Sequence, residues 1–478
     1  MSEAEAKPKS KLARAAKIGG AVLGVGAVGV FAWLSLRIFP IGTGIAAKTA
    51  CSDVFVAGRA PEGLLEQEVP SAAAFVSYTI DESAGTATAS AFGLASKTAV
   101  YRPGLGCALA LDTEVAALKA EGFELELRPR PDAPWPRGDA DDTRPDPEGL
   151  DRAALDAAID TIFAEGGWAE DEHRDERPLN TRAVVVVQHG RLLAERYAPG
   201  FDADTPQLGW SMTKSVTSAL VGILVGRGRL DIDEPMGFAE WSSPDDPRSA
   251  LTWDHLLRMS SGLEWNEDYG LRSDVTVMLF DVYDGTAEAV SRELAHDVDT
   301  VWYYSSGTTN LLHRRMREIF ANDRAYHRFP YQALFEPLGM TSALMETDSS
   351  GTYVGSSFMY ATPRDWARFG QLYLQDGVWE GERILPEGWV ARTITPTSTP
   401  SDPPGGYGLQ WWLNAAPNPE ERGLPDVPVD AFWASGHQGQ NVVVVPSRDA
   451  VIVRMGMTNG PGWPRSKFVA AVLEALPE

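Results

Sequence analysis

The sequence predicts a mixed domain of the α/β (α+β) class, in which helices flank an antiparallel sheet that carries a mostly helical insert. Two β-hairpins and the helical patterns between them predict this fold. The first hairpin is expected at residues 183–197, around the turn His189-Gly190, and the second at residues 441–455, around residues 446–449. Since strands stand at both ends of residues 150–478 and helices lie between them, the two ends should close one sheet.

Residues 1–45 are predicted to form a cytoplasmic tail and a membrane anchor. The run from Ile18 to Leu36 holds 19 residues without a charge, close to the roughly 20 that a helix needs to cross a bilayer. Basic residues dominate the chain before this run, which favours a cytoplasmic N-terminus and a periplasmic or extracellular catalytic domain. A cleaved signal peptide is the alternative, but its apolar core is usually shorter, about 7–15 residues.

Residues 46–128 are predicted to form a small β-rich region, with strands at Asp53–Val56, Ala73–Thr79 and Thr86–Ala91. Cys51 and Cys107 enclose these strands. In an exported protein such a pair favours a disulfide, whereas in a cytosolic protein two buried thiols are the more common outcome. Residues 129–149 are dense in Pro, Asp and Arg and are interpreted as a linker.

Helical spacing of apolar residues begins at Leu155 and continues through Ile159 and Ile162. Another helix is expected from Pro363 to Leu374, where Thr362 can cap the first turn and proline suits the first helical position.

The charge balance argues against nucleic-acid binding. The chain has 42 Lys and Arg against 66 Asp and Glu, a net charge of −24, whereas a nucleic-acid surface is basic. The seven histidines form no cluster such as H-E-x-x-H. We therefore expect neither a metal nor an organic cofactor.

The strongest chemical signal is Ser211-Met212-Thr213-Lys214, which precedes a stripe of apolar residues at helical spacing. Ser211 should start a buried helix, with Lys214 one turn further on the same face. A serine hydroxyl needs an adjacent base to become a nucleophile, and a desolvated lysine can supply one. Read alone, the pattern equally fits a capping serine followed by a surface lysine.

Two further segments could complete a site. Tyr304, in Trp302-Tyr303-Tyr304-Ser305-Ser306-Gly307, could shuttle protons if a nearby cation lowered its pKa. His437 lies among small residues in Ser435-Gly436-His437-Gln438-Gly439-Gln440, just before the second hairpin, where backbone could approach a ligand. The simpler interpretations are a core aromatic cluster and a glycine-rich turn.

Together and in this order, the three segments resemble the serine β-lactamase and penicillin-binding protein superfamily. The closer resemblance is to its class C-like branch, which includes esterases, D,D-peptidases and 6-aminohexanoate-oligomer hydrolases. It covers about residues 150–478, and Met259-Ser260-Ser261-Gly262-Leu263 also fits. The resemblance implies that Ser211 is the acylated nucleophile, and that Lys214 and Tyr304 share the proton transfers.

The resemblance further implies that His437 shapes the site or assists proton transfer, and that Ser306 and Gly439 contact the substrate. The backbone N–H groups of Ser211 and Gln440 would bind the oxyanion. Two positions depart from the β-lactamase pattern: Ser306 replaces the Asn of Y-x-N, and His437 replaces the Lys of K-T-G. We therefore do not expect efficient β-lactam hydrolysis.

The sequence thus predicts a serine hydrolase that acts on an ester, amide or peptide through an acyl-enzyme. A Ser-His-Asp hydrolase would show G-x-S-x-G, and Gly209-Trp210-Ser211-Met212-Thr213 lacks the final glycine. A non-catalytic relative that binds cell-wall peptide or a protein partner is the alternative. The sequence does not give the oligomeric state.

Overall fold

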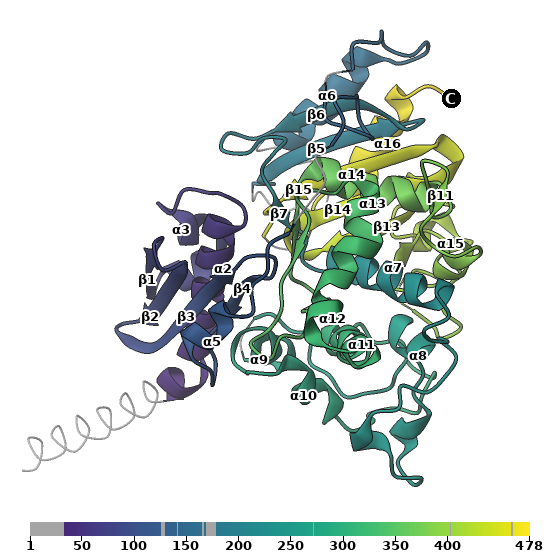
Figure 1. Cartoon of the computed structure of the whole chain (residues 1–478). Helices are drawn as coiled ribbons and strands as arrows, with labels where there is room; N and C mark the ends of the chain where they lie inside the picture. Colours follow the sequence, from purple (N-terminus) through teal and green to yellow (C-terminus); the bar gives the residue numbers. More distant parts are fainter. Residues whose placement is uncertain are drawn as a thin grey trace, which may run out of the picture.

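The computed structural model describes residues 33–125, 130–140, 142–164, 167–168, 178–270, 272–401, 403–459 and 462–478. Figure 1 shows an N-terminal unit beside a larger body that holds the rest of the chain. The N-terminal unit contains helices α2 (Phe39–Phe55), α3 (Leu64–Glu68), α4 (Pro70–Ala73) and α5 (Val115–Lys119) and strands β1 (Val76–Asp81), β2 (Thr86–Ala91), β3 (Leu94–Arg102) and β4 (Gly106–Leu109).

The N-terminal unit is a four-stranded antiparallel sheet, in the order β1-β2-β3-β4, with helix α2 packed against it. The prediction of a strand at Thr86–Ala91 is confirmed. The prediction at Asp53–Val56 is wrong, because these residues end helix α2. The prediction at Ala73–Thr79 is correct only from Val76, where β1 begins. Small residues let α2 lie close to its neighbours and bury most of its surface, so it lacks the polar stripe that marks a surface helix.

The larger body is built on a six-stranded antiparallel sheet in the order β12-β13-β14-β15-β5-β6. Its strands are β5 (Thr181–Gln188), β6 (Arg191–Tyr197), β12 (Trp412–Leu413), β13 (Phe432–Gly436), β14 (Gln440–Val445) and β15 (Ala450–Gly456). Both predicted hairpins are present, and β15 pairs with β5. The prediction that the two ends of the domain close one antiparallel sheet is therefore confirmed.

Helices cover both faces of this sheet, which explains why β5 is almost continuously apolar. Val184 and Val186 pack with α6 (Arg152–Phe163) and α16 (Arg465–Ala475) on one face. Val185 and Val187 lie in the core on the other face, with α7 (Met212–Gly226) and α14 (Pro363–Leu374). Helix α14 has the predicted bounds, and Thr362 Oγ1 accepts a hydrogen bond from the N–H of Asp365.

Between α7 and α14 lies the insert, which is mostly helical as predicted. Its elements are η1 (Ala239–Trp241), η2 (Pro247–Ala250), α8 (Trp253–Leu257), α9 (Asp274–Phe280), α10 (Gly285–Val290), α11 (Ser306–Ile319), α12 (Asp323–Pro330), the π-helix η3 (Tyr331–Phe335), α13 (Glu336–Leu338), β8 (Leu344–Met345) and β9 (Met359–Ala361). The remaining elements are β7 (Gln207–Leu208), β10 (Val378–Trp379), β11 (Glu382–Arg383), α15 (Trp389–Thr393) and the 3-10 turns η4 (Pro419–Glu421), η5 (His437–Gly439) and η6 (Pro446–Arg448).

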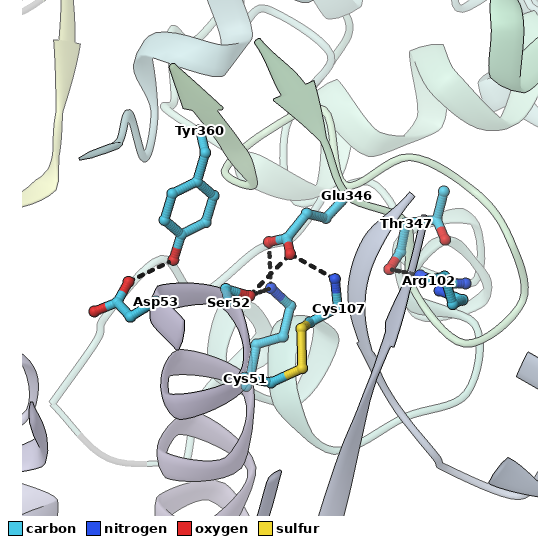
Figure 2. The surroundings of a disulfide bond; sticks show 9 residues. Cys51, Ser52, Asp53, Arg102, Cys107, Glu346, Thr347 and Tyr360 are labelled. Atoms are coloured by element: carbon cyan, nitrogen blue, oxygen red, sulfur yellow. Dashed lines mark hydrogen bonds and ion pairs between the residues drawn. A yellow bond between two sulfur atoms is a disulfide. The ribbon is translucent and has the colours of Figure 1, made fainter. Parts of the chain in front are cut away.

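A buried polar cluster joins the N-terminal unit to the larger body (Figure 2). The carboxylate of Glu346 is paired with the ammonium of Lys48 and accepts hydrogen bonds from Ser52 Oγ, at 2.8 Å, and from the N–H of Cys107, at 2.7 Å. The predicted disulfide between Cys51 and Cys107 is present beside this cluster. It therefore connects α2 with β4, the two elements that supply the donors.

The segment interpreted as a linker contacts α14 in its described residues. Arg130 pairs with Asp365, and Arg368 donates to Asp139 at 2.9 Å and to the carbonyl oxygen of Pro136 at 2.8 Å. Most of the predicted membrane helix at Ile18–Leu36 lies outside the described residues, which include only its last four. Along the part of the chain that the structure describes, no helix has the length and apolar character needed to cross a bilayer.

Candidate active site

Ser211 lies at the start of α7, as the sequence predicts, and two close backbone approaches fix its position. Trp210, directly before it, has a positive φ of 48°, a conformation that costs a bulky residue energy and is often found at functional sites. A Cβ added to Gly436 would lie 2.1 Å from the carbonyl oxygen of Gly209. Only glycine therefore allows β13 to approach the chain just before Ser211.

Lys214 is 1% exposed and donates to three oxygen atoms in the site. Its Nζ lies 3.1 Å from Ser211 Oγ, 2.9 Å from Ser306 Oγ and 3.0 Å from the carbonyl oxygen of Ser356. Burial lowers the pKa of Lys214 to about 8, and the negative charge of Glu267 partly opposes this shift. With a pKa of about 8, roughly a tenth of the amine is neutral at pH 7, and this neutral form, which grows as the pH rises, can accept the serine proton.

Tyr304 precedes α11, and its ring lies 4.8 Å from Lys214 Nζ. It stacks on Trp412, with 5.6 Å between the ring centroids. Burial raises the pKa of Tyr304 well above its usual value, Glu267 raises it further, and a hydrogen bond with Ser211 lowers it. The phenol is thus protonated at rest, so Lys214 is the better resting base and Tyr304 is suited to passing a proton on.

Glu267 is a member of this cluster that the sequence analysis missed. Its carboxylate accepts hydrogen bonds from Ser306 Oγ at 2.5 Å, from the N–H of Ser306 at 2.9 Å and from Trp265 Nε1 at 2.7 Å. It therefore fixes the start of α11 and orients the hydroxyl that meets Lys214. No motif marks it, because it stands in an irregular loop 39 residues before Ser306.

His437 faces two aromatic rings. Its ring stacks on Tyr269, with 5.2 Å between centroids, and meets the edge of Trp210 at 5.5 Å. Partial desolvation of the ring among these neighbours lowers the pKa of His437 below its usual value, although the residue is exposed at the surface. A neutral imidazole beside Trp210 fits the predicted role of shaping the site.

Gln440 is predicted to bind the oxyanion through its backbone N–H and Gly439 to contact the substrate, and other polar atoms of both residues bond within the protein. Gln440 Oε1 accepts from the N–H of Gly456 at 2.9 Å, and its Nε2 donates to the carbonyl oxygen of His437 at 3.2 Å. The carbonyl oxygen of Gly439 accepts from Arg454 Nη1 at 3.0 Å. These bonds stabilise the turn that carries His437.

The structure thus brings Ser211, Lys214, Tyr304 and Ser306 into one cluster and places His437 against its edge. In the part of the chain that the structure describes, no group of three or more His, Cys, Asp or Glu side chains is arranged to hold a metal ion.

Known proteins are similar to this chain in sequence. The model of the Beta-lactamase family matches residues 169–476, well over half of the chain. The chain is 26% identical over 314 residues to the 6-aminohexanoate-dimer hydrolase of Paenarthrobacter ureafaciens, which covers 59% of this chain and 73% of that relative. It is 21% identical over 300 residues to an uncharacterized protein of Alkalihalophilus pseudofirmus, covering 57% of this chain and 82% of that protein.

Solved structures share the fold. A penicillin-binding protein homologue from Caulobacter crescentus superposes with a TM-score of 0.51 at 16% identity, over 70% of this chain and all of that one. A protein from Bacillus anthracis assigned as a 6-aminohexanoate-dimer hydrolase superposes with a TM-score of 0.52 at 23% identity, over 64% of this chain and 85% of that one. The chain therefore belongs to the Beta-lactamase family.

Proposed function

We propose that the protein hydrolyses an ester or amide through a covalent acyl-enzyme formed on Ser211. The observation that carries this proposal is the 3.1 Å approach of Lys214 Nζ to Ser211 Oγ, together with the lowered pKa of that lysine. A base within hydrogen-bond reach of the hydroxyl is what nucleophilic catalysis by serine requires.

In the proposed first half-reaction, Ser211 Oγ attacks the carbonyl carbon of the substrate while Lys214 accepts its proton. The negative charge that develops on the carbonyl oxygen is stabilised by the backbone N–H groups of Ser211 and Gln440. Tyr304 passes a proton to the leaving alcohol or amine, the bond to that group breaks, and the acyl group stays on Ser211. The step uses no metal and no organic cofactor.

In the second half-reaction, water gives a proton to the same pair of residues and attacks the acyl carbon. The bond between that carbon and Ser211 Oγ then breaks, Ser211 takes the proton back, and the acyl group leaves as a carboxylic acid. Amides are included in the proposed substrate class because one relative is a 6-aminohexanoate-dimer hydrolase. β-Lactams are left out, because Ser306 and His437 depart from the β-lactamase pattern. Efficient turnover of a cephalosporin would contradict this choice.

Labelling with a fluorophosphonate probe tests the proposal. The wild-type chain should be labelled and should cleave a short-chain p-nitrophenyl ester, and both properties should be lost in Ser211→Ala. Ser215→Ala is a matched control, because this buried serine lies one turn further along α7 and donates to the carbonyl oxygen of Gln410. A folded wild-type chain that is not labelled would instead favour a non-catalytic relative that binds cell-wall peptide or a protein partner.

We also propose that residues 1–45 anchor the protein and that the hydrolase domain lies outside the cytoplasm. The uncharged run Ile18–Leu36, the basic residues before it and the disulfide between Cys51 and Cys107 support this. Protease added to spheroplasts should then cleave the domain. Cleavage only after lysis would contradict the proposal.

A further inference from the structure

The N-terminal unit exposes large apolar side chains at one end. Trp33 and Leu36, before helix α2, are 54% and 75% exposed, and Phe92 and Leu94, at the turn between β2 and β3, are 68% and 45% exposed. The two pairs belong to one surface, because the ring of Phe92 lies 5.8 Å from that of Phe39, the first residue of α2. We call this surface the apolar end.

The turn that carries Phe92 has a residue that folding alone does not favour. Ala91 pairs with Leu94, so Phe92 and Gly93 form a two-residue turn, and both have positive φ, 50° and 77°. Such a turn favours asparagine followed by glycine, since a bulky side chain is strained at positive φ. The aromatic ring at this position is strained and exposed, which points to a partner outside the fold.

Charged residues are absent from the three segments that meet at the apolar end. Residues 38–47, 70–77 and 91–96 contain no Asp, Glu, Lys or Arg, although the chain as a whole carries a net charge of −24. The segments are neighbours, because the rings of Phe75 and Phe92 both contact that of Phe39, and Val76 pairs with Ala91. These segments thus carry no carboxylate, and Asp281, which lies beside β3, is neutralised by its pair with Lys97.

We propose that the apolar end rests in the interfacial layer of a lipid bilayer, with Phe92 and Leu94 inserted among the lipids. The uncharged run from Ile18 ends at this surface. Ile38 N–H bonds to the carbonyl oxygen of Leu34, and Gly42 N–H bonds to that of Ile38, so the helical path leads from the run directly into α2.

The side chains at the apolar end suit such an interface. Tryptophan is enriched at the level of the lipid headgroups. Insertion of an exposed apolar loop at the boundary with the acyl chains lowers the free energy. Arg37, the first charge after the run, is also exposed and can contact anionic headgroups. The absence of carboxylates removes the repulsion that an anionic membrane would otherwise exert.

Depth measurement with nitroxide labels on the full chain, reconstituted in vesicles of phosphatidylcholine and phosphatidylglycerol, tests the proposal. The native cysteines form a disulfide, so a cysteine introduced by Phe92→Cys can be labelled alone. Its label should be accessible to oxygen and shielded from an aqueous nickel reagent. Ser83→Cys, in the exposed turn between β1 and β2 at the other end of the sheet, is the control and should show the reverse.

Equal exposure of the two labels to the aqueous reagent would overturn the proposal. A label at residue 92 that is shielded from both the nickel reagent and oxygen would also overturn it, because a second copy or a protein partner, and not lipid, would then cover the surface. The variant Phe92→Asn separates this role from folding. Asparagine suits the turn, so the melting temperature should stay the same or rise, while a label at Leu94→Cys in this variant should become accessible to the nickel reagent. A fall in melting temperature with an unchanged label depth would mean that Phe92 serves the fold.

Discussion

The charge of Glu267 is predicted to set the pH at which the site becomes active. Lys214 must be neutral to accept a proton, so kcat/KM should rise with pH and level off above an inflection near pH 8. Glu267 raises the pKa of Lys214. Glu267→Gln removes the charge but keeps an acceptor for Ser306, so the inflection should move to lower pH. Glu264→Gln, an exposed carboxylate on the same loop, should leave it in place. An unmoved inflection in Glu267→Gln would contradict this electrostatic role.

Replacement of Lys214 should remove the general base and leave the nucleophile, Ser211, in place. Lys214→Met should lower kcat/KM by about 10²- to 10⁴-fold, the usual contribution of general base catalysis, and should eliminate the inflection near pH 8. The fold should tolerate the change, because replacing a buried amine by a thioether removes a desolvation cost. Steady-state kinetics over pH 6–10 would show both effects. Activity that keeps its pH dependence would assign the base to another group.

Some residues of the site could be predicted from the sequence and others could not. Ser211 and Lys214 could be placed together because residues three positions apart on a helix lie on the same face. Tyr304 and His437 needed the resemblance to a family, since their contacts arise from tertiary packing. Glu267 was missed for the same reason, because its partner lies 39 residues away and loop geometry brings them together.

At the scale of elements, the disulfide is predicted to stabilise the N-terminal unit. Cys51 and Cys107 are separated by 56 positions, and closing a loop of that length in the unfolded chain contributes about 4 kcal/mol. Urea unfolding should show the double variant Cys51→Ser with Cys107→Ser to be less stable by about that amount. A reducing agent should destabilise the wild type similarly and leave the variant unchanged. Equal stability of oxidised and reduced wild type would contradict the prediction.

Elements with a regular pattern could be predicted, and buried irregular ones could not. The two hairpins and helix α14 follow from turn residues, alternating patterns and a capping threonine. Helix α2 was mistaken in part for a strand, because Ala46, Ala47 and Ala50 pack it against a sheet and leave no polar face. Its end at Asp53–Val56 carries β-type residues, and tertiary packing overrides that local preference.

At the scale of the whole molecule, the N-terminal unit supports the loop that carries Glu267. Helix α2 contacts α9, which follows that loop, and Lys97 of β3 donates to the carbonyl oxygen of Phe280 at 2.7 Å and to Asp281 at 2.5 Å. The pair formed by Lys48 and Glu346 lies beside Phe358, whose ring is 6.2 Å from that of Trp210. The position of the N-terminal unit is therefore coupled to the walls of the site.

Gly44→Val tests this coupling. A Cβ at Gly44 would lie 2.4 Å from the carbonyl oxygen of Phe280, so α2 and α9 must separate and the loop before α9 should shift. A misplacement of about 1 Å can cost roughly 100-fold in rate, so we expect kcat/KM to fall by at least tenfold. Gly42→Val is the control, because the atoms nearest to a Cβ there belong to Phe75 and Val76, within the N-terminal unit. Both changes overpack the structure, at a cost of about 1–3 kcal/mol. If they lower kcat/KM equally, reduced stability is the cause, and the N-terminal unit has no specific role in positioning the site.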